Sequence, residues 1–337
     1  MEDLVSVVIP AYDEEAFLGH CLDSVRAQDY PNLEIIVVNG PSRDGTADVV
    51  RARTAVDDRV HLVHNPRRSI PSSMNLGVHR ARGRWLVRVD AHSTIDPSYV
   101  RIAVDRLREG TWAGVGGRKE GVGRTPAGRA ISVAMSSRLG VGNSTYHFGT
   151  SAQEVDHLPF GAYSLEVVRA MGGWNEDLVA NEDFEFDHRL LLAGHRLLFD
   201  PRMVIHWHCR QSVVDLYRQY RRYGMGKVDV VWLHPGSLNP RHVVPPAFVA
   251  YAAVGLLVTA RRPRRWLGML APYAAAVAVE SVRAGRSLGR PRERLSLPAA
   301  FVAMHVGWGV GFWLRLAQTL PRHARQALPG SRGRELT

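Results

Sequence analysis

The chain of 337 residues has few cysteines, and it lacks the pattern of a secretory leader at its start. Neither Cys21 nor Cys209 has a neighbour at metal-ligand spacing, so we predict two buried free thiols in a reducing compartment. Residues 1–4 are partly acidic and run directly into an apolar strand pattern. We therefore expect the first domain in the cytosol.

Two nucleotide-binding patterns are missing after the first apolar run, residues 5–9. No G-x-G-x-x-G follows this run, which disfavours a plain NAD-binding domain. A nucleotidyltransferase would need a loop rich in Gly, Lys and Arg at the same place, and residues 10–15 (PAYDEE) provide none. Pro10 instead ends the strand, and the acids after it suit the start of a helix.

Acidic residues are scarce toward the end of the chain. From Arg241 onward, 15 Lys and Arg face 3 Asp and Glu, whereas residues 1–240 hold 28 basic and 29 acidic residues. A nucleic-acid-binding protein normally carries its basic face on the folded domain, so this class is disfavoured. A basic segment interleaved with apolar runs fits an anionic membrane surface better.

Buried-strand patterns alternate with helical repeats along the first part of the chain. Strands are expected at 5–9, 33–38, 60–63 and 84–89, and helices at 17–25, from about 47, and at 73–82. This alternation predicts an α/β fold with a doubly wound, mainly parallel sheet. Residues 121–150 are rich in Gly, Ser and Thr, so a mobile loop over the site and a plain structural loop both remain open. Further elements are expected at 97–108, from 115, and at 160–164, 165–171, 184–193, 196–200 and 212–222.

The segment Asp90-Ala91-His92 closes the strand at 84–89. On an extended chain, a carboxylate and an imidazole two residues apart point the same way. This pair suits a divalent transition ion better than magnesium alone. Open α/β sheets bind ligands outside the carboxyl ends of their strands. An ordinary surface loop is the competing interpretation.

Five stretches in order resemble the inverting family 2 glycosyltransferases of the GT-A fold, and more closely their succinoglycan-type β-glycosyltransferase branch. The resemblance covers roughly residues 5–230. Its motifs are VVIPAYDE at 7–14, VNGPSRDGT at 38–46, VDAH at 89–92, the segment from GGWNE to NED at 172–183, and QYRRY at 219–223. Each motif is weak alone, but their order together is specific.

The resemblance implies a nucleoside-diphosphate sugar as donor and a divalent metal, Mn²⁺ or Mg²⁺, on Asp90 and His92. It implies Asp183 as the base that deprotonates the acceptor hydroxyl. Residues expected to bind the donor are Pro10, Ala11, Tyr12, Glu14, Asn39, Arg68 and Asp90. Residues expected on the acceptor or diphosphate side are Glu182, Gln219, Arg222 and Tyr223.

Two departures from the family pattern affect these expectations. Asn39 stands where an acid usually holds the uracil ring, which leaves the base preference open. His92 replaces the second acid of the metal motif, which leaves open a lower metal affinity or a tilt toward manganese. Simpler structural roles compete as well. Glu182 and Asp183 would suit the first turn of a helix, and Arg68 would suit a solvated basic loop.

Three apolar runs, at 244–260, 266–279 and 297–314, predict a membrane-attached region. Basic stretches at 261–265 and 283–294 separate them. If every run spanned the bilayer, one basic stretch would violate the positive-inside rule, so we expect at least one in-plane or re-entrant hairpin on the cytoplasmic face. The predicted divisions are a GT-A domain at 1–235, membrane-associated helices at 236–320 and a basic, disordered tail at 321–337.

The sequence therefore predicts a metal-dependent inverting glycosyltransferase at the cytoplasmic face of the cell membrane. It would transfer single sugars to a lipid-linked or growing glycan acceptor, because three short runs are too few for a channel that exports polymer. A catalytically inactive GT-A-like membrane scaffold is the alternative, which Asn39 and His92 favour and which Asp90 and Asp183 oppose. A nucleic-acid partner is not expected.

Overall fold

The computed structural model describes residues 2–327, which form two compact units. The first comprises the described residues up to Arg124 together with Met135–Cys209. The second comprises Thr125–Ala134 and the described residues from Arg210 onward. The break after Cys209 groups helix α9 (Val213–Leu233) with the C-terminal helices, whereas the sequence pattern placed it in the first domain.

A nine-stranded sheet in the order β3-β2-β1-β4-β8-β6-β9-β5 organises the first unit, and β7 pairs with β9 off this path. The strands β1 to β4 are mutually parallel, β6 and β9 are also parallel, and β8, β5 and β7 pair antiparallel. The strand bounds are β1 Val5–Ala11, β2 Leu33–Asn39, β3 Val60–His64, β4 Trp85–Arg88, β5 Ser93–Ile95, β6 Gly114–Val122, β7 Gln153–Glu154, β8 Ala162–Ser164 and β9 Leu197–His208.

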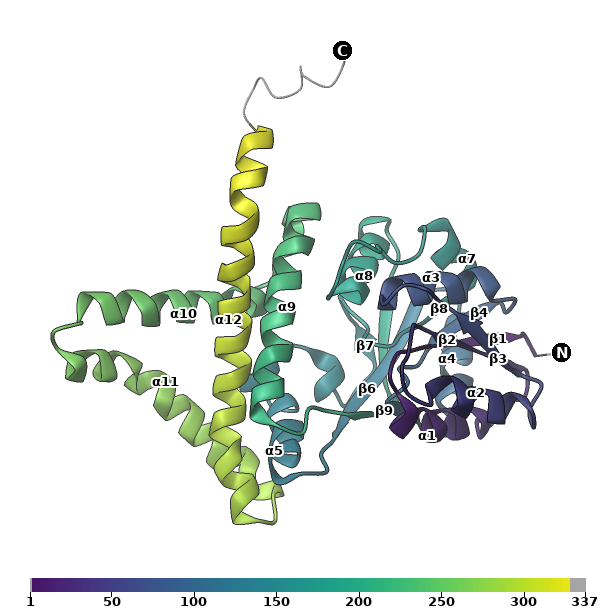
Figure 1. The fold of residues 1–337 in the computed structure, drawn as a ribbon, viewed down its shortest axis with the longest axis horizontal. Coiled ribbons are helices and arrows are strands. Elements are labelled where there is room, and N and C mark those ends of the chain that lie inside the picture. Colours follow the sequence, from purple (N-terminus) through teal and green to yellow (C-terminus); the bar gives the residue numbers. More distant parts are fainter. Residues whose placement is uncertain (1, 328–337) are drawn as a thin grey trace. The chain divides into compact units, whose positions relative to one another are not determined.

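Helices cover both faces of this sheet (Figure 1). On one face, α3, α7 and α8 pack over a core that includes Val8, Ile36, Met74 and Phe186. On the other, α1 buries Leu18 and its apolar neighbours one helical turn apart. The helix bounds are α1 Glu15–Arg26, α2 Thr46–Thr54, α3 Ile70–Arg80, α4 Tyr99–Arg108, α6 Arg138–Val141, α7 Leu165–Ala170 and α8 Glu182–Leu192, with a 3-10 turn, η1, at Thr145–His147.

The strand order reverses at β1, which lies between β2 and β4. Open α/β sheets bind ligands at such a switch point, outside the carboxyl ends of the strands. The turn after β1 and the Asp90 segment after β4 both leave the sheet at this edge. The topology therefore brings the first and third resemblance motifs to one place.

Two stretches differ from the expected elements. Residues 121–150 are largely helical, because Ala130, Ile131 and Ala134 are buried on one side of α5 (Pro126–Met135). Strand β9 does not stop at Pro201. The β6–β9 register shifts between Gly116 and Arg118, so Pro201 lies in an irregular stretch where no ladder hydrogen bond is required of it.

The second unit consists of α5, α9 and three further helices, α10 Pro240–Val258, α11 Pro263–Ala284 and α12 Pro291–Ala327. By length and composition, two helical segments within the described residues could cross a membrane, Pro240–Val258 and Pro291–Pro321. The middle apolar run, in α11, does not meet that test. The expected tail begins inside α12, and its residues 328–337 lie outside the described part of the chain.

Candidate active site

The turns that follow β1 and β2 are joined by hydrogen bonds. The Asp13 N–H donates to Ser42 Oγ (2.9 Å), and the Arg43 N–H donates back to Asp13 Oδ1 (2.8 Å). The Glu14 N–H donates to Thr46 Oγ1 (2.8 Å). These bonds fix both turns at the carboxyl ends of adjacent parallel strands. The structure thus brings together the donor-binding residues predicted on the two turns, which are Pro10, Ala11, Tyr12, Glu14 and Asn39.

Three of the predicted donor-binding side chains, Tyr12, Asn39 and Arg68, have defined contacts at this edge. The guanidinium carbon of Arg68 lies 4.1 Å from the ring centroid of Tyr12. Asn39 is buried, and its Oδ1 accepts a hydrogen bond from the Ser42 hydroxyl (2.8 Å). This bond uses one of the two acceptor positions of the carboxamide oxygen, and the amide N–H group can donate to a ligand.

Arg88, at the end of β4, gathers three carboxylates around one buried guanidinium. Its Nε donates to Asp90 Oδ1 (3.0 Å), one terminal nitrogen donates to Asp183 Oδ1, and the other lies 3.5 Å from Glu182 Oε1. Burial opposes the positive charge, but Asp183, Asp90 and Glu182 together raise the pKa of Arg88. The arginine thereby links the metal motif to the acceptor-side motif, which lie far apart in the sequence.

Asp183 lies at the start of α8 with one oxygen held and one open to solvent or ligand. Its Oδ1 accepts from Arg88 and from Trp174 Nε1 (3.0 Å), and its side chain is 16% exposed. Desolvation raises the pKa of Asp183 to about 7, which Arg88 opposes and Glu182 reinforces. A carboxylate with such a pKa can take up a proton near neutral pH.

The contacts of Asp183 do not match the competing interpretation of this residue as a helix cap. Its hydrogen-bond donors are the side chains of Arg88 and Trp174, not backbone N–H groups of the first turn. The chain before α8 is also held in place specifically. Asn75 on α3 bonds the Trp174 N–H and carbonyl (both 2.8 Å), and Gly173 adopts φ +71 where an added Cβ would lie 2.3 Å from Asn75 Oδ1.

His92 makes hydrogen bonds through both ring nitrogens. Trp207 Nε1 can only donate, so His92 Nε2 accepts from it (2.8 Å), and His92 Nδ1 then donates to Glu14 Oε1 (2.9 Å). In this arrangement the imidazole offers no nitrogen to a metal. No group of three or more His, Cys, Asp or Glu within residues 2–327 could hold a metal ion.

A metal that is carried largely by substrate phosphates needs only one or two protein carboxylates. Asp90 fits that requirement, because Arg88 bonds only its Oδ1. The residues present therefore fit a divalent ion at Asp90, and His92 is not a ligand in this arrangement. The predicted pairing of Asp90 and His92 as joint ligands stays a prediction that this geometry does not support.

Sequence reasoning missed Lys119, on β6. Its Nζ lies 3.9 Å from the ring centroid of Trp207 and 4.8 Å from that of Phe160. Phe160 also faces Arg88 (5.6 Å) and Trp207 bonds His92, so both rings place Lys119 beside the site. Desolvation lowers the pKa of Lys119 to about 8, although Asp90 opposes the shift. Within the described residues, its ammonium group has no hydrogen bond or ion pair.

Backbone strain collects at the same place. Among the described residues, the non-glycines with positive φ are Asp13 (53°), Phe160 (57°) and Asn181 (63°). Asp13 lies in the first turn, Phe160 beneath Arg88 and Lys119, and Asn181 directly before Glu182. Such conformations cost of order 1–3 kcal/mol each and cluster at functional sites. Their positions support the assignment of this edge as the active site.

Three predicted residues lie outside this network. Gln219, Arg222 and Tyr223 are on α9, in the second unit. Gln219 is buried, and its Oε1 has no hydrogen-bond partner among the described residues. Their role on the acceptor or diphosphate side stays a prediction. His206 lies on β9, and its Nε2 bonds Asp96 Oδ1 (2.9 Å).

Comparison with known sequences gives a consistent result. Residues 6–164 match the model of the family described as glycosyl transferase family 2. The succinoglycan biosynthesis protein ExoA of Rhizobium meliloti (strain 1021) is 29% identical over 316 residues, covering 92% of this chain and 94% of that protein. A second relative, from Methanococcus voltae, is 24% identical over 251 residues, which cover 69% of this chain and 78% of that protein. It is named dolichyl N-acetyl-alpha-D-glucosaminyl phosphate 3-beta-D-2,3-diacetamido-2,3-dideoxy-beta-D-glucuronosyltransferase.

Solved structures share the fold. The mannosyltransferase PcManGT from Pyrobaculum calidifontis, in complex with GDP-Man and Mn²⁺, aligns with a TM-score of 0.58 at 21% identity and covers 91% of this chain and 87% of that chain. TarS 1-349 from S. aureus, in complex with UDP-GlcNAc, aligns with a TM-score of 0.53 at 18% identity and covers 95% and 92%. The likeness confirms the GT-A fold expected from the sequence.

Proposed function

We propose that this chain, whose residues 6–164 match the model of glycosyl transferase family 2, transfers one sugar, with inversion, from a nucleoside-diphosphate sugar to a lipid-linked or growing glycan acceptor. The observation that carries this proposal is Asp183. A carboxylate with a pKa raised to about 7 and one unbonded oxygen lies beside Asp90 at the switch point of the sheet.

Asp183 is suited to act as the base in a single displacement. As the acceptor hydroxyl oxygen bonds to the anomeric carbon, the bond from that carbon to the diphosphate oxygen breaks, and its electron pair leaves with the diphosphate. The hydroxyl proton passes to Asp183 Oδ2, because Oδ1 is held by Arg88 and Trp174. One displacement inverts the anomeric carbon.

The leaving diphosphate needs positive charge. Lys119 supplies it from the chain itself, because aromatic rings rather than carboxylates hold its ammonium group. Arg88 is already paired with three carboxylates and instead fixes their positions. A divalent ion held by Asp90 would act as a Lewis acid on the diphosphate. The Mn²⁺ in the PcManGT complex supports this assignment.

The two turns are suited to hold the nucleotide. Tyr12, with Arg68 over its ring, offers a stacking surface for the base. Asn39 presents an amide N–H group, which favours a base carbonyl oxygen as its partner. The hydrogen bond from His92 positions Glu14. Glu14 lies in the turn after β1, where its carboxylate can accept from a ribose hydroxyl.

A membrane location fits the C-terminal helices. Only 17% of the most apolar window of α10 is buried inside the protein, and Leu257 and Val258 are mostly exposed. Apolar surface of this kind, flanked by the arginines at 261–265, suits an anionic cytoplasmic membrane face. The name of the relative ExoA, which refers to succinoglycan biosynthesis, supports a polysaccharide or lipid-linked acceptor.

The test uses the full chain in nanodiscs with Mn²⁺, a panel of nucleotide sugars and a polyprenyl-linked acceptor fraction. Release of nucleoside diphosphate is measured for the wild type, Asp90→Ala, Asp183→Asn and the surface control Arg80→Gln. We expect release from one donor, retained in the control and lost in the two site variants. Failure of every donor to react would contradict the proposal.

A further inference from the structure

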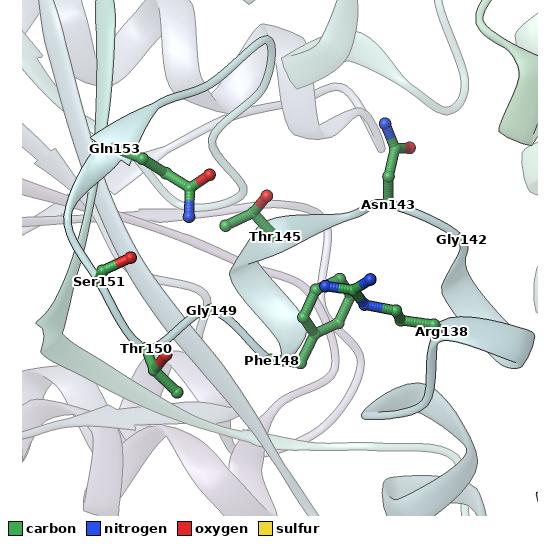
Figure 2. A pocket seen from close by; sticks show the side chains of 9 residues that line it. All are labelled: Arg138, Gly142, Asn143, Thr145, Phe148, Gly149, Thr150, Ser151 and Gln153. Atoms are coloured by element: carbon green, nitrogen blue, oxygen red, sulfur yellow. The ribbon is translucent and has the colours of Figure 1, made fainter.

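A second feature of the first unit is a polar pocket away from the Arg88 cluster. It encloses about 590 Å³ and lies between the short helix α6, η1 and the segment that leads into β7 (Figure 2). Ligand pockets commonly have volumes of roughly 300–1,000 Å³. The space is therefore large enough for a sugar.

The walls of the pocket carry hydrogen-bonding groups without any acid. Neutral amides and hydroxyls come from Asn143, Thr145, Ser151 and Gln153, and the aromatic ring is Phe148. Figure 2 shows the Gln153 amide and the Thr145 hydroxyl on the same side of the pocket. Such side chains can donate to and accept from sugar hydroxyls. The residue types suit a saccharide rather than an apolar ligand.

Arg138 adds one positive charge to this wall. Its guanidinium carbon lies 5.2 Å from the ring centroid of Phe148, which orients the group over the pocket. Within the part of the chain that the structure describes, Arg138 has no ion pair. Every arginine in the Arg88 and Asp200 clusters, in contrast, is bonded to a carboxylate. An arginine in a pocket with no acid favours an anionic group on the ligand.

The pocket is linked to the start of α8 through aromatic contacts. Tyr146, in η1, meets the His157 ring edge-on at 5.6 Å, and His157 meets Phe184 at 5.6 Å. Phe184 directly follows Asp183, and His157 contributes to the electrostatic environment of Asp183. These contacts connect η1, whose Thr145 lines the pocket, to the residue that follows Asp183.

We propose that this pocket is an acceptor subsite for an acidic saccharide, in which Arg138 binds the anionic group and the amides and hydroxyls bind the sugar ring. The anionic group is either a carboxylate on a sugar or the phosphate that joins a sugar to its carrier. The proposal rests on the proposed glycosyl transfer, which it deepens by naming the chemistry of the acceptor.

The experiment measures ligand binding by the full chain in nanodiscs, using ligand-observed NMR. The probes are a disaccharide ending in glucuronate, a hexose 1-phosphate and a neutral disaccharide. Wild type is compared with Arg138→Gln and with Arg80→Gln, an exposed arginine on α3 that serves as a matched control. Arg138 is exposed, so its replacement is expected to leave the fold intact.

We expect the wild type and the control to bind one anionic probe about tenfold more tightly than the neutral one, and Arg138→Gln to lose that preference. Preference for glucuronate identifies an acidic sugar, and preference for the phosphate identifies a sugar phosphate. Equal binding of charged and neutral probes, or an unchanged preference in Arg138→Gln, would overturn the subsite.

Donor turnover by the same wild-type preparation separates this proposal from the transferase proposal. Turnover without any preference for the anionic probes overturns the subsite alone. An Arg138-dependent preference without turnover of any donor supports the pocket as a binding site but contradicts its place in glycosyl transfer.

Discussion

Replacing Asp183 with asparagine should make the protein more stable while it abolishes transfer. Asparagine keeps the shape of the side chain, and its Oδ1 can still accept from Arg88 and Trp174. The change removes one of the negative charges that surround Arg88, which retains Asp90 and Glu182. Loss of the base should lower the transfer rate at least about a hundredfold.

The size and sign of the stability effect follow from the raised pKa of Asp183. Burial moves it from the ordinary 3.8 to about 7, and a shift of one unit corresponds to about 1.4 kcal/mol. The folded state holds this proton more tightly than the unfolded state, so the wild type loses stability as the pH rises from about 4 to about 7. Asparagine does not titrate. Its advantage should therefore grow by roughly 2–3 kcal/mol between pH 5 and pH 8.

Thermal unfolding of the full chain in detergent at pH 5, 6.5 and 8 measures this advantage. The matched control is Asp187→Asn on the same helix, because the Asp187 carboxylate accepts from the His157 ring, the Leu158 N–H and the Tyr163 hydroxyl. That variant should be less stable than the wild type at every pH. If Asp183→Asn were less stable than the wild type at pH 8, or if its advantage did not change with pH, the account of Asp183 would be refuted.

The other predictions concern the rate and the donor. The kcat/KM for the acceptor should rise with pH and level off above about 7, because Asp183 must be ionised to act as a base, and a flat profile from pH 5 to 8 would contradict this role. Lys119→Met should weaken the binding of nucleoside diphosphate about tenfold, measured by calorimetry, and leave the binding of the nucleoside unchanged. Arg118 is paired with Glu120, so Arg118→Gln should leave both affinities unchanged. Asn39→Asp should shift donor choice toward a base that donates N–H, and an unchanged donor panel would exclude Asn39 from base recognition.

Much of the fold follows from local sequence patterns. The β-branched runs at 5–9 and 33–38 indicated buried parallel strands, and the structure places them in β1 and β2 with little change. Cys21 and Cys209 are both buried and neither forms a disulfide, as predicted. Elements fixed by tertiary context were harder to predict. Helix α5 is rich in small residues that give a weak periodic signal, and β9 crosses Pro201 only because its partner strand shifts register there.

The site was predictable where it depends on segments with a distinctive order of residues. Asp90, Asp183 and the two turns after β1 and β2 come from motifs that the sequence displays. The roles of Arg88 and Lys119 were not predictable, because Arg88 alternates with apolar neighbours as in any strand and Lys119 lies between two other charged residues, Arg118 and Glu120. Their roles depend on contacts with Asp183 on α8 and Trp207 on β9, which are distant in sequence. The pairing of His92 with Trp207 has the same origin.

The central claim is that Asp183 deprotonates the acceptor during a single displacement at the anomeric carbon. The most direct test is the anomeric configuration of the first product, determined by NMR at early conversion with an α-linked nucleotide sugar and the wild-type chain. We expect a β-linked product from the wild type and no linked product from Asp183→Asn. An α-linked product, or the same product from both proteins at equal rates, would contradict it.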